Sequence, residues 1–274
     1  MLRRAFVEES DGEGSRKVSM TRSIVFANRK GGCGKTTTAV NVAHTLAMAS
    51  NRVLLVDVDP QAHATLSMGM ALGRDEPGIS HCLNQWAEVE EVVKATRVEG
   101  LYLIPSSREL TSYEIELSWR GGSEARLAEQ LSSLAGSFDY LLFDPPPTVG
   151  LLTVSCLVAA REVYIPMPMH FLAMEGLAEM MRLIYTVNAT WSPNLRLKGI
   201  IPTFFNKNTR LAREILEDIA KNFGEEKLLP GIRTNVSLAE APGHGKSVFE
   251  YAPQSAGAKD YRRLAAMIHA AGEE

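Results

Sequence analysis

The residues with the clearest chemistry form one short stretch, Lys30–Thr37, which reads KGGCGKTT. It follows an apolar run, Ser23–Asn28, and precedes a run with helical periodicity, Ala39–Met48. A glycine-rich turn between a strand and a helix N-terminus gathers backbone N–H groups and the positive end of the helix dipole at one point. This stretch is therefore predicted to hold the phosphates of a nucleotide, and its glycines let the backbone approach them.

The spacing departs by one residue from the ordinary phosphate-binding pattern, Gly-x-x-x-x-Gly-Lys-Thr. The first glycine would stand where this chain has Arg29, and a second lysine, Lys30, stands five residues before Lys35. In the pattern the lysine reaches the β- and γ-phosphates and the next hydroxyl binds Mg²⁺, roles that fall here to Lys35 and Thr36. The Cys33 side chain is expected to point away. The predicted nucleotide contacts in this stretch are Lys30, Gly31, Gly32, Cys33, Gly34, Lys35, Thr36 and Thr37.

Three carboxylates stand at the ends of predicted strands. Asp57 and Asp59 form an Asp-Val-Asp sequence after one apolar run, and Asp144 closes another. Carboxyl ends of parallel strands face the ligand crevice, and side chains at i and i+2 lie on the same side of an extended chain. One acid of the pair is predicted to complete the Mg²⁺ shell and the other to orient an attacking water. Asp144 is predicted to hold Mg²⁺ directly or through water, so the predicted metal ligands are Thr36, Asp59 and Asp144.

These side chains need a sheet to position them, and the rest of the chain predicts one. Short apolar runs alternate with helical patterns, which indicates an α/β fold: a doubly wound, mostly parallel twisted sheet with helices on both faces. Strands are expected at Ser23–Asn28, Val53–Asp57, Leu101–Pro105, Tyr140–Asp144, Val163–Pro166 and Leu197–Phe204. Helices are expected at Thr36–Ala49, Ala62–Met70, Arg108–Trp119, Glu124–Ala135, Gly150–Ala160, Leu172–Asn188, Leu211–Phe223 and Ala256–Ala271.

The composition limits the classes of protein to which this chain can belong. The 274 residues are 45% apolar and 22% charged, with a net charge of −3, so any contact with nucleic acid must come from a local patch. The three cysteines show no metal-ligand spacing, which fits a reducing cytosol. No run reaches the ~18–20 apolar residues of a membrane helix. A mixed-charge tail at residues 1–20 is predicted to be disordered, and residues 21–274 to form a single domain.

Several motifs occur together and in a fixed order: KGGCGKTTT, VDVDPQ, FDPPPTVGLLT, AMEGL and NVSLAEAPGHGKSV. From Thr21 to Ile268 the chain thereby resembles the ParA family of partition ATPases, which belongs to the deviant-Walker group that includes MinD. The resemblance implies a slow, Mg²⁺-dependent ATPase that takes ATP and ADP and forms an ATP-sandwich homodimer. It implies nonspecific DNA binding by that dimer, stimulation by a ParB-like adaptor, and the positioning of chromosome, plasmid or protein cargo over the cytoplasmic nucleoid.

Site roles follow from this resemblance. Lys30 matches the family's signature lysine, which crosses the dimer interface to the partner's phosphates. Asp59 matches the acid associated with activating water, and Asp57 matches the second acid that accompanies it. A cation at the outer end of the loop could stabilise phosphoryl charge in a facing subunit, while the alternative is a solvated loop lysine. Adenine is expected to lie against the loop after Leu197–Phe204, with Asn206 as a hydrogen-bond partner, and against Pro230–Asn235.

The expected DNA contacts are less complete than in the family. Arg210 matches a family arginine, but two further arginines are replaced by Thr234 and Ser237. Each lost phosphate contact weakens DNA binding. The alternative is that Arg210 belongs to a solvated helix face with nearby glutamates. The predicted DNA-binding residues are Arg210, Lys207, Arg213, Arg233 and Lys246.

Three other classes of protein remain as alternatives. A MinD-like membrane-positioning ATPase would need a basic amphipathic anchor, which the small-residue-rich helix at Ala256–Ala271 lacks. A redox protein like nitrogenase reductase would need Cys82 and Cys156 as cluster ligands, and neither has the glycine-flanked setting of that group. A non-enzymatic scaffold would not need the intact set of lysines and acids described above.

Overall fold

The computed structural model describes residues 20–272, except residues 74–75, 119–121, 171 and 207. The predicted tail at residues 1–20 therefore lies outside the described residues apart from Met20, and so does Lys207. The chain forms a seven-stranded sheet with the order β3-β4-β2-β5-β1-β6-β7. The strands are β1 (Arg22–Phe26), β2 (Val53–Asp57), β3 (Lys94–Ala95), β4 (Leu101–Ile104), β5 (Tyr140–Asp144), β6 (Glu162–Pro168) and β7 (Arg196–Thr203).

Every neighbouring pair in this sheet is parallel except β3 with β4. Strand β1 lies between β5 and β6, and Asp57 at the end of β2 pairs directly with Asp144 at the end of β5. All residues of β2 and β5 are buried, because helices cover both faces of the sheet. The phosphate loop and the acids therefore lie together at the carboxyl ends of β1, β2 and β5.

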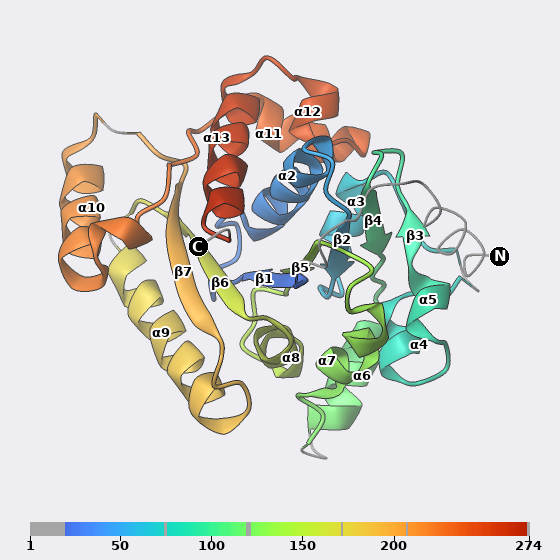
Figure 1. The fold of residues 1–274 in the computed structure, drawn as a ribbon. Helices are drawn as coiled ribbons and strands as arrows, with labels where there is room; N and C mark the ends of the chain where they lie inside the picture. The colour runs from blue at the N-terminus through green and yellow to red at the C-terminus, as the bar shows by residue number, and fades with distance from the viewer. Residues whose placement is uncertain (1–19, 74–75, 119–121, 171, 207, 273–274) are drawn as a thin grey trace.

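The helices form a layer on each side of the sheet (Figure 1). Helices α2 and α13 lie above the sheet in this view, and α8 and α9 lie below it. The α-helices are α2 (Lys35–Met48), α3 (His63–Ser67), α4 (Ile79–Leu83), α5 (Val89–Val92), α6 (Leu110–Ser118), α7 (Arg126–Leu131), α8 (Leu151–Ala159), α9 (Ala173–Thr190), α10 (Arg210–Phe223), α11 (Val236–Glu240), α12 (Val248–Tyr251) and α13 (Ala256–Ala270). The 3-10 helices are η2 (Ser132–Leu134), η3 (Glu225–Lys227) and η4 (Ala241–His244).

Two apolar cores flank the sheet, one on each face. On the upper face α2 is packed against α13, and the Thr38 hydroxyl lies 3.2 Å from the Tyr261 hydroxyl inside this core. On the lower face α8 and α9 bury Leu152, Cys156 and Leu177. Because the helix that follows the phosphate loop is enclosed between the sheet and α13, the loop itself is held on a rigid support.

The predicted α/β fold class is confirmed, and the differences lie in its short elements. Strand β3 has only two residues, which is too short to produce an apolar alternation in the sequence. Helices α4, α5, α11 and α12 were not predicted, and each has four or five residues. Among the described residues no helix combines the length and the apolar character that crossing a membrane requires.

Candidate nucleotide-binding site

The phosphate loop joins the end of β1 to the start of α2, as the sequence predicts. Gly32 and Gly34 have positive φ angles of 69° and 90°, and Gly34 is the N-cap of α2. A side chain would strain the backbone at both positions, so glycine allows the tight turn that exposes the backbone amides. The Cys33 side chain, by contrast, is buried in the protein, and burial raises the pKa of its thiol.

Two side chains support this loop from within. The Lys35 ammonium donates to the backbone carbonyl of Lys30 at 3.2 Å, so it bridges the two ends of the loop. The Thr203 hydroxyl, at the end of β7, donates to the Cys33 carbonyl at 2.9 Å. Sequence reasoning missed Thr203, since one threonine at a strand end carries no distinctive signal.

The acids after β2 differ in what they contact. Asp57 is fully buried and accepts hydrogen bonds from the Thr65 amide and hydroxyl, both at 2.7 Å, and from the Asp59 amide at 3.2 Å. Burial raises the pKa of Asp57 to about 7, against these hydrogen bonds, which lower it. Asp59 lies at the cavity wall, where one oxygen accepts from the Gln61 amide at 2.9 Å. Asp57 thus fixes the start of α3, while Asp59 is available to a ligand.

Asp144 is the most unusual acid of the site. It is fully buried, and no donor meets either carboxylate oxygen in hydrogen-bonding geometry, although the Thr36 side chain lies near enough to lower the pKa of Asp144. Burial and the neighbouring charge of Asp57 raise the pKa of Asp144 well above its ordinary value, and Thr36 and Lys35 oppose this only in part. A buried carboxylate without partners is costly unless a cation or donor arrives. Mg²⁺ binds through one or two carboxylates, phosphate oxygens and waters, so Asp144 and the Thr36 hydroxyl suit this ion.

A cavity of about 910 Å³ opens beside the phosphate loop. At one end it is lined by the loop, the first turn of α2 and Asp59, and at the other by residues 232–236 with Leu238, Pro242 and Gly243. The first group of residues is rich in amides and charge, whereas the second combines apolar side chains such as Ile232 and Leu238 with the polar Arg233, Thr234 and Asn235. Cavities of this size and character hold ligands with a charged and an apolar part.

Lys30 does not line this cavity. Its ammonium donates to the Leu172 carbonyl at 3.2 Å, just before α9, and the adjacent Arg29 forms an ion pair of 3.1 Å with Glu179 on the same helix. Residues 29 and 30 therefore extend away from the phosphate cradle of their own subunit. The predicted role of Lys30 across a dimer interface stays a prediction.

The structure places the predicted adenine contact, Asn206, outside the cavity lining. The chain turns sharply at Phe204, whose φ is 50°, and the exposed Asn206 accepts from the Asn208 amide at 3.0 Å. Residues 232–235 of the predicted segment Pro230–Asn235 do line the cavity. Within it Asn235 has a buried side-chain oxygen without a partner, which makes it the better candidate for contact with a base.

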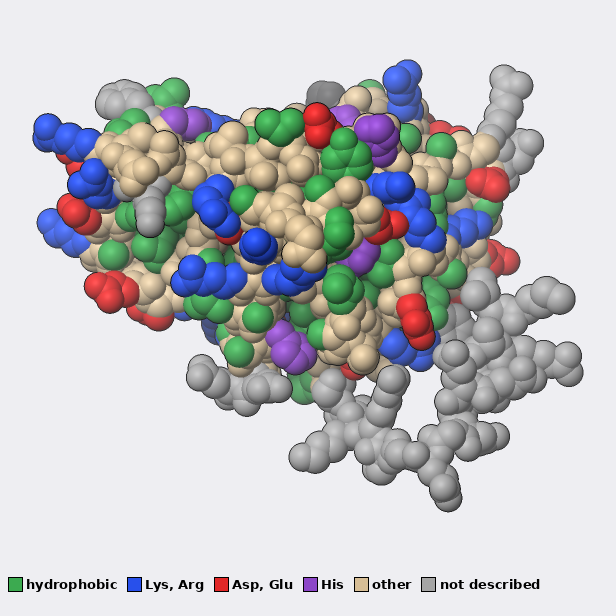
Figure 2. Space-filling model, turned by 90° about the horizontal axis from the view of Figure 1, so that it is seen from above, with side chains coloured by type: hydrophobic (Ala, Val, Ile, Leu, Met, Phe, Trp, Pro, Cys, Tyr) green, Lys and Arg blue, Asp and Glu red, His purple; other side chains and the backbone are tan. Residues whose placement is uncertain are grey.

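The four candidate DNA-binding residues that the structure describes lie in three different parts of the fold. Arg210 is exposed and paired with Glu214 at 2.7 Å, and the guanidinium of Arg213 donates to the Asn208 carbonyl at 3.2 Å. Arg233 lies at the cavity, in an ion pair of 2.7 Å with Asp260 on α13, whereas exposed Lys246 lies between η4 and α12. Figure 2, the view from above, shows Lys and Arg side chains spread over this face with few acids between those near its middle.

Comparisons with known proteins identify the family of this chain. Residues 21–197 match the model of a family described as an AAA domain. The sporulation initiation inhibitor protein Soj of Bacillus subtilis is 38% identical over 92% of this chain and 100% of its own length. The chromosome-partitioning ATPase Soj of Thermus thermophilus is 40% identical over 92% of this chain and 97% of its own. The chain belongs to the Soj/ParA family.

A solved structure adds the ligands of this fold. Cobyrinic acid a,c-diamide synthase from Mycobacterium smegmatis, with a bound ATP analogue and magnesium, has a TM-score of 0.80 and 32% identity. The similarity covers 93% of this chain and 96% of that one. It supports the predicted cofactors, ATP or ADP with Mg²⁺, for the Soj/ParA chain described here.

Proposed function

We propose that this protein is an ATP-hydrolysing partition protein that positions a large cargo over DNA. The cavity lined by the phosphate loop, Asp59 and residues 232–239 carries the proposal, because loop amides and charged groups suit a triphosphate and the apolar side chains of the second segment suit a base. Relatives named chromosome-partitioning ATPases, similar over nearly the whole chain, supply the cellular role.

The roles of the residues follow from their positions. Lys35 and the loop amides would bind the β- and γ-phosphates, and Thr36 and Asp144 would hold Mg²⁺, whose charge would neutralise that of the phosphates. Asp59 orients the attacking water from the cavity wall. Asp57 acts as a positioning residue, since its hydrogen bonds to Thr65 and to the Asp59 amide fix the segment that carries Asp59.

Lys30 makes the active site depend on a second subunit. Its side chain extends toward α9 and away from the phosphates of its own subunit. In an ATP-bound homodimer a lysine so directed would reach the facing nucleotide and stabilise charge on the transferred phosphoryl group. The dimer would then require the γ-phosphate, so hydrolysis would dissolve it.

The dimer would bind DNA without sequence preference through Arg210, Arg213 and the neighbouring basic residues, and a ParB-like adaptor would stimulate hydrolysis. Each arginine or lysine on a phosphate contributes to a salt-dependent affinity. Because Thr234 and Ser237 stand where the family has arginines, this affinity is expected to be modest. Such DNA binding would place the protein on the nucleoid. The membrane-positioning alternative has less support, since relatives over nearly the whole chain, such as those from Treponema pallidum and Myxococcus xanthus, are named chromosome-partitioning proteins.

Gel filtration of the Asp59→Ala protein tests this proposal. With Mg²⁺ and ATP the variant should elute as a dimer that retains nonspecific duplex DNA at low salt, because ATP is bound but not hydrolysed. With ADP it should elute as a monomer that does not retain DNA. A monomer in ATP would contradict the switch, while an ATP dimer that binds vesicles of anionic lipid and no DNA would favour the membrane-positioning alternative.

A further inference from the structure

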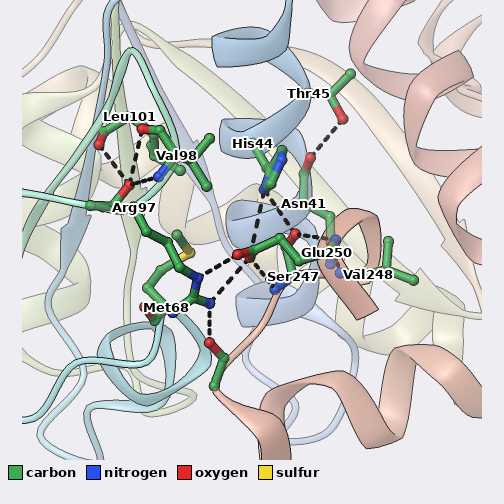
Figure 3. A network of polar contacts seen from close by, with 12 residues as sticks. Asn41, His44, Thr45, Met68, Arg97, Val98, Leu101, Ser247, Val248 and Glu250 are labelled. Atoms are coloured by element: carbon green, nitrogen blue, oxygen red, sulfur yellow. Dashed lines mark hydrogen bonds and ion pairs between the residues drawn. The ribbon is translucent and has the colours of Figure 1, made fainter. Parts of the chain in front are cut away.

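A polar network lies outside the cavity lining and joins four parts of the chain (Figure 3). At its centre the guanidinium of Arg97, from the turn between β3 and β4, forms an ion pair with Glu250 on α12. The same guanidinium donates to the carbonyl of Met68, just after α3, at 3.1 Å and to the carbonyl of Gly245, just after η4. All three of its nitrogens are therefore occupied, and only an arginine has a fork of this shape.

The turn that carries Arg97 is itself fixed. The Thr96 hydroxyl donates to the Leu101 carbonyl at 2.8 Å and accepts from the Val98 amide at 3.0 Å. Arg97 therefore extends from a closed turn at the sheet edge, which reduces the entropy lost when the guanidinium is held in one place. The turn thus presents Arg97 to α3 and α12 in a defined position.

Glu250 carries the network on to the helix of the phosphate loop. Its carboxylate accepts from the Ser247 amide at 3.0 Å, and the Ser247 hydroxyl lies 2.8 Å from Nδ1 of His44 on α2. One residue further, the Val248 amide donates to the Asn41 side chain at 2.9 Å. Burial lowers the pKa of His44, so its neutral ring can accept the Ser247 proton. The start of α12 is thereby fastened to α2.

Two glycines bring the joined segments into backbone contact. Gly69 and Gly245 have positive φ angles of 72° and 59°. A Cβ at Gly69 would lie 2.9 Å from the Gly245 carbonyl oxygen, and one at Gly245 would lie 2.7 Å from the Gly69 Cα. The end of α3 and the turn after η4 therefore touch as only glycines allow, and Arg97 bonds to both sides of this contact.

These segments continue two walls of the cavity. We call them the phosphate wall, which runs from Asp59 through α3, and the base wall, which is formed by residues 232–243. Helix α3 follows Asp59 and contributes Leu66 and Ser67 to the lining, whereas η4 contributes Pro242 and Gly243. The phosphate wall and the base wall thus meet at Arg97. In a chain without this junction, nucleotide binding would have to order one wall against the other and would lose affinity.

We propose that Arg97 and Glu250 form a positioning clamp that holds the base wall of the nucleotide cavity against the wall that carries Asp59. The clamp touches neither the nucleotide nor the reacting atoms. Its effect rests on the proposed function, because it assumes that this cavity binds the nucleotide. Removal of the clamp weakens nucleotide binding in protein that is otherwise folded.

Calorimetric titration with Mg²⁺-ADP tests the clamp. ADP is used so that the dimer proposed for ATP makes no contribution. Arg97→Ala and Glu250→Gln should each raise the Kd about 5- to 20-fold, and the double variant should be no weaker than the worse single one, because both remove the same junction. Arg97→Lys should lie between Arg97→Ala and the wild type, since its ammonium keeps the charge but not the fork. Arg108→Ala, which removes an exposed arginine two residues before α6, should leave the Kd unchanged.

Comparison of the Tm with the Kd of each variant distinguishes the clamp from a purely structural role. Titrations are made where circular dichroism shows each variant folded, so a role in global stability alone would lower the Tm and leave the Kd within twofold of the wild type. That result for Arg97→Ala and Arg97→Lys would overturn the clamp, as would fully additive effects of Arg97→Ala and Glu250→Gln. A wild-type protein that binds no Mg²⁺-ADP would instead remove the proposed function.

Discussion

Asp144 shows how single residues at this site sacrifice stability for ligand binding. Its carboxylate is buried without a hydrogen-bond partner, directly opposite Asp57 across the β2–β5 pair. Natural proteins rarely leave such a group unsatisfied unless a ligand completes it. We therefore propose that Asp144 supplies one ligand of a Mg²⁺ site that the nucleotide completes.

Replacement of Asp144 by Asn should therefore raise the stability of the protein and weaken its Mg²⁺-dependent binding of ATP. An amide is less costly to bury than a carboxylate, so the nucleotide-free variant should gain about 1–3 kcal/mol in unfolding free energy, measured by urea denaturation. The factor by which Mg²⁺ raises the ATP affinity should be at least tenfold smaller in the variant than in the wild type. A variant that is less stable and still shows the wild-type Mg²⁺ dependence would contradict this role.

His44 makes a second, independent prediction at the residue scale. Burial lowers the pKa of His44, whereas in the unfolded chain it titrates near its ordinary value of 6.5. The unfolded state thus takes up a proton first as the pH falls, and stability present above pH ~6.5 is lost below it. His44→Gln should show a smaller loss of Tm between about pH 7.5 and 5.5 than the wild type. Equal losses in both proteins would place the acid sensitivity elsewhere.

At the scale of elements, the loop and α2 act as one unit. Gly34 has a φ of 90° at the helix N-cap, and Thr203 fixes the preceding carbonyl from β7. The orientation of the backbone amides in the phosphate loop thus depends on a φ angle that residues other than glycine rarely adopt.

Gly34→Ala should therefore impair function beyond its effect on stability. A Cβ there meets Thr203 only at 3.5 Å, so the cost comes from backbone strain of about 1–2 kcal/mol. ATP affinity should fall at least tenfold. The matched control is Gly136→Ala, where φ is 80° and no atom lies within 4 Å of the new Cβ. The control should lose similar stability and keep wild-type affinity; equal effects on affinity would contradict the account.

The elements also show what the sequence could predict. The strands β2 and β5 were predicted to the residue, since burial on both faces leaves a continuous apolar run, and α2 was predicted to within one residue at each end. Asn206 was assigned to the cavity by analogy, and the turn at Phe204 directs it elsewhere. The Arg97 junction could not be predicted at all. It depends on contacts between residues 68, 97 and 250, which no local pattern in the sequence connects.

At the scale of the whole molecule, the proposed DNA contact lies at one edge of the sheet. Helix α10 lies beside β7 at one edge of the sheet, and β3 forms the opposite edge (Figure 1). A DNA surface on α10 would therefore be local, which agrees with a net charge of −3 for the whole chain.

Arg210→Glu should reduce retention of nonspecific duplex DNA by the ATP-bound protein severalfold at low salt, because it removes a phosphate contact and adds repulsion. ATP affinity should not change. Lys94→Glu, the same change of charge on β3 at the other edge, is the matched control and should retain DNA normally. If the two variants lose DNA equally, the effect belongs to net charge rather than to α10.

The most direct test of the central claim is calorimetric titration of Mg²⁺-ATP into the wild-type and Lys35→Ala proteins. Lys35 bridges the loop through the Lys30 carbonyl and lines the cavity, so its removal takes away the cation nearest the phosphates. The wild type should bind one ATP per chain, and Lys35→Ala should lose at least 100-fold in affinity, about 2.7 kcal/mol, while circular dichroism shows it folded. Wild-type affinity in the folded variant would mean that ATP binds elsewhere.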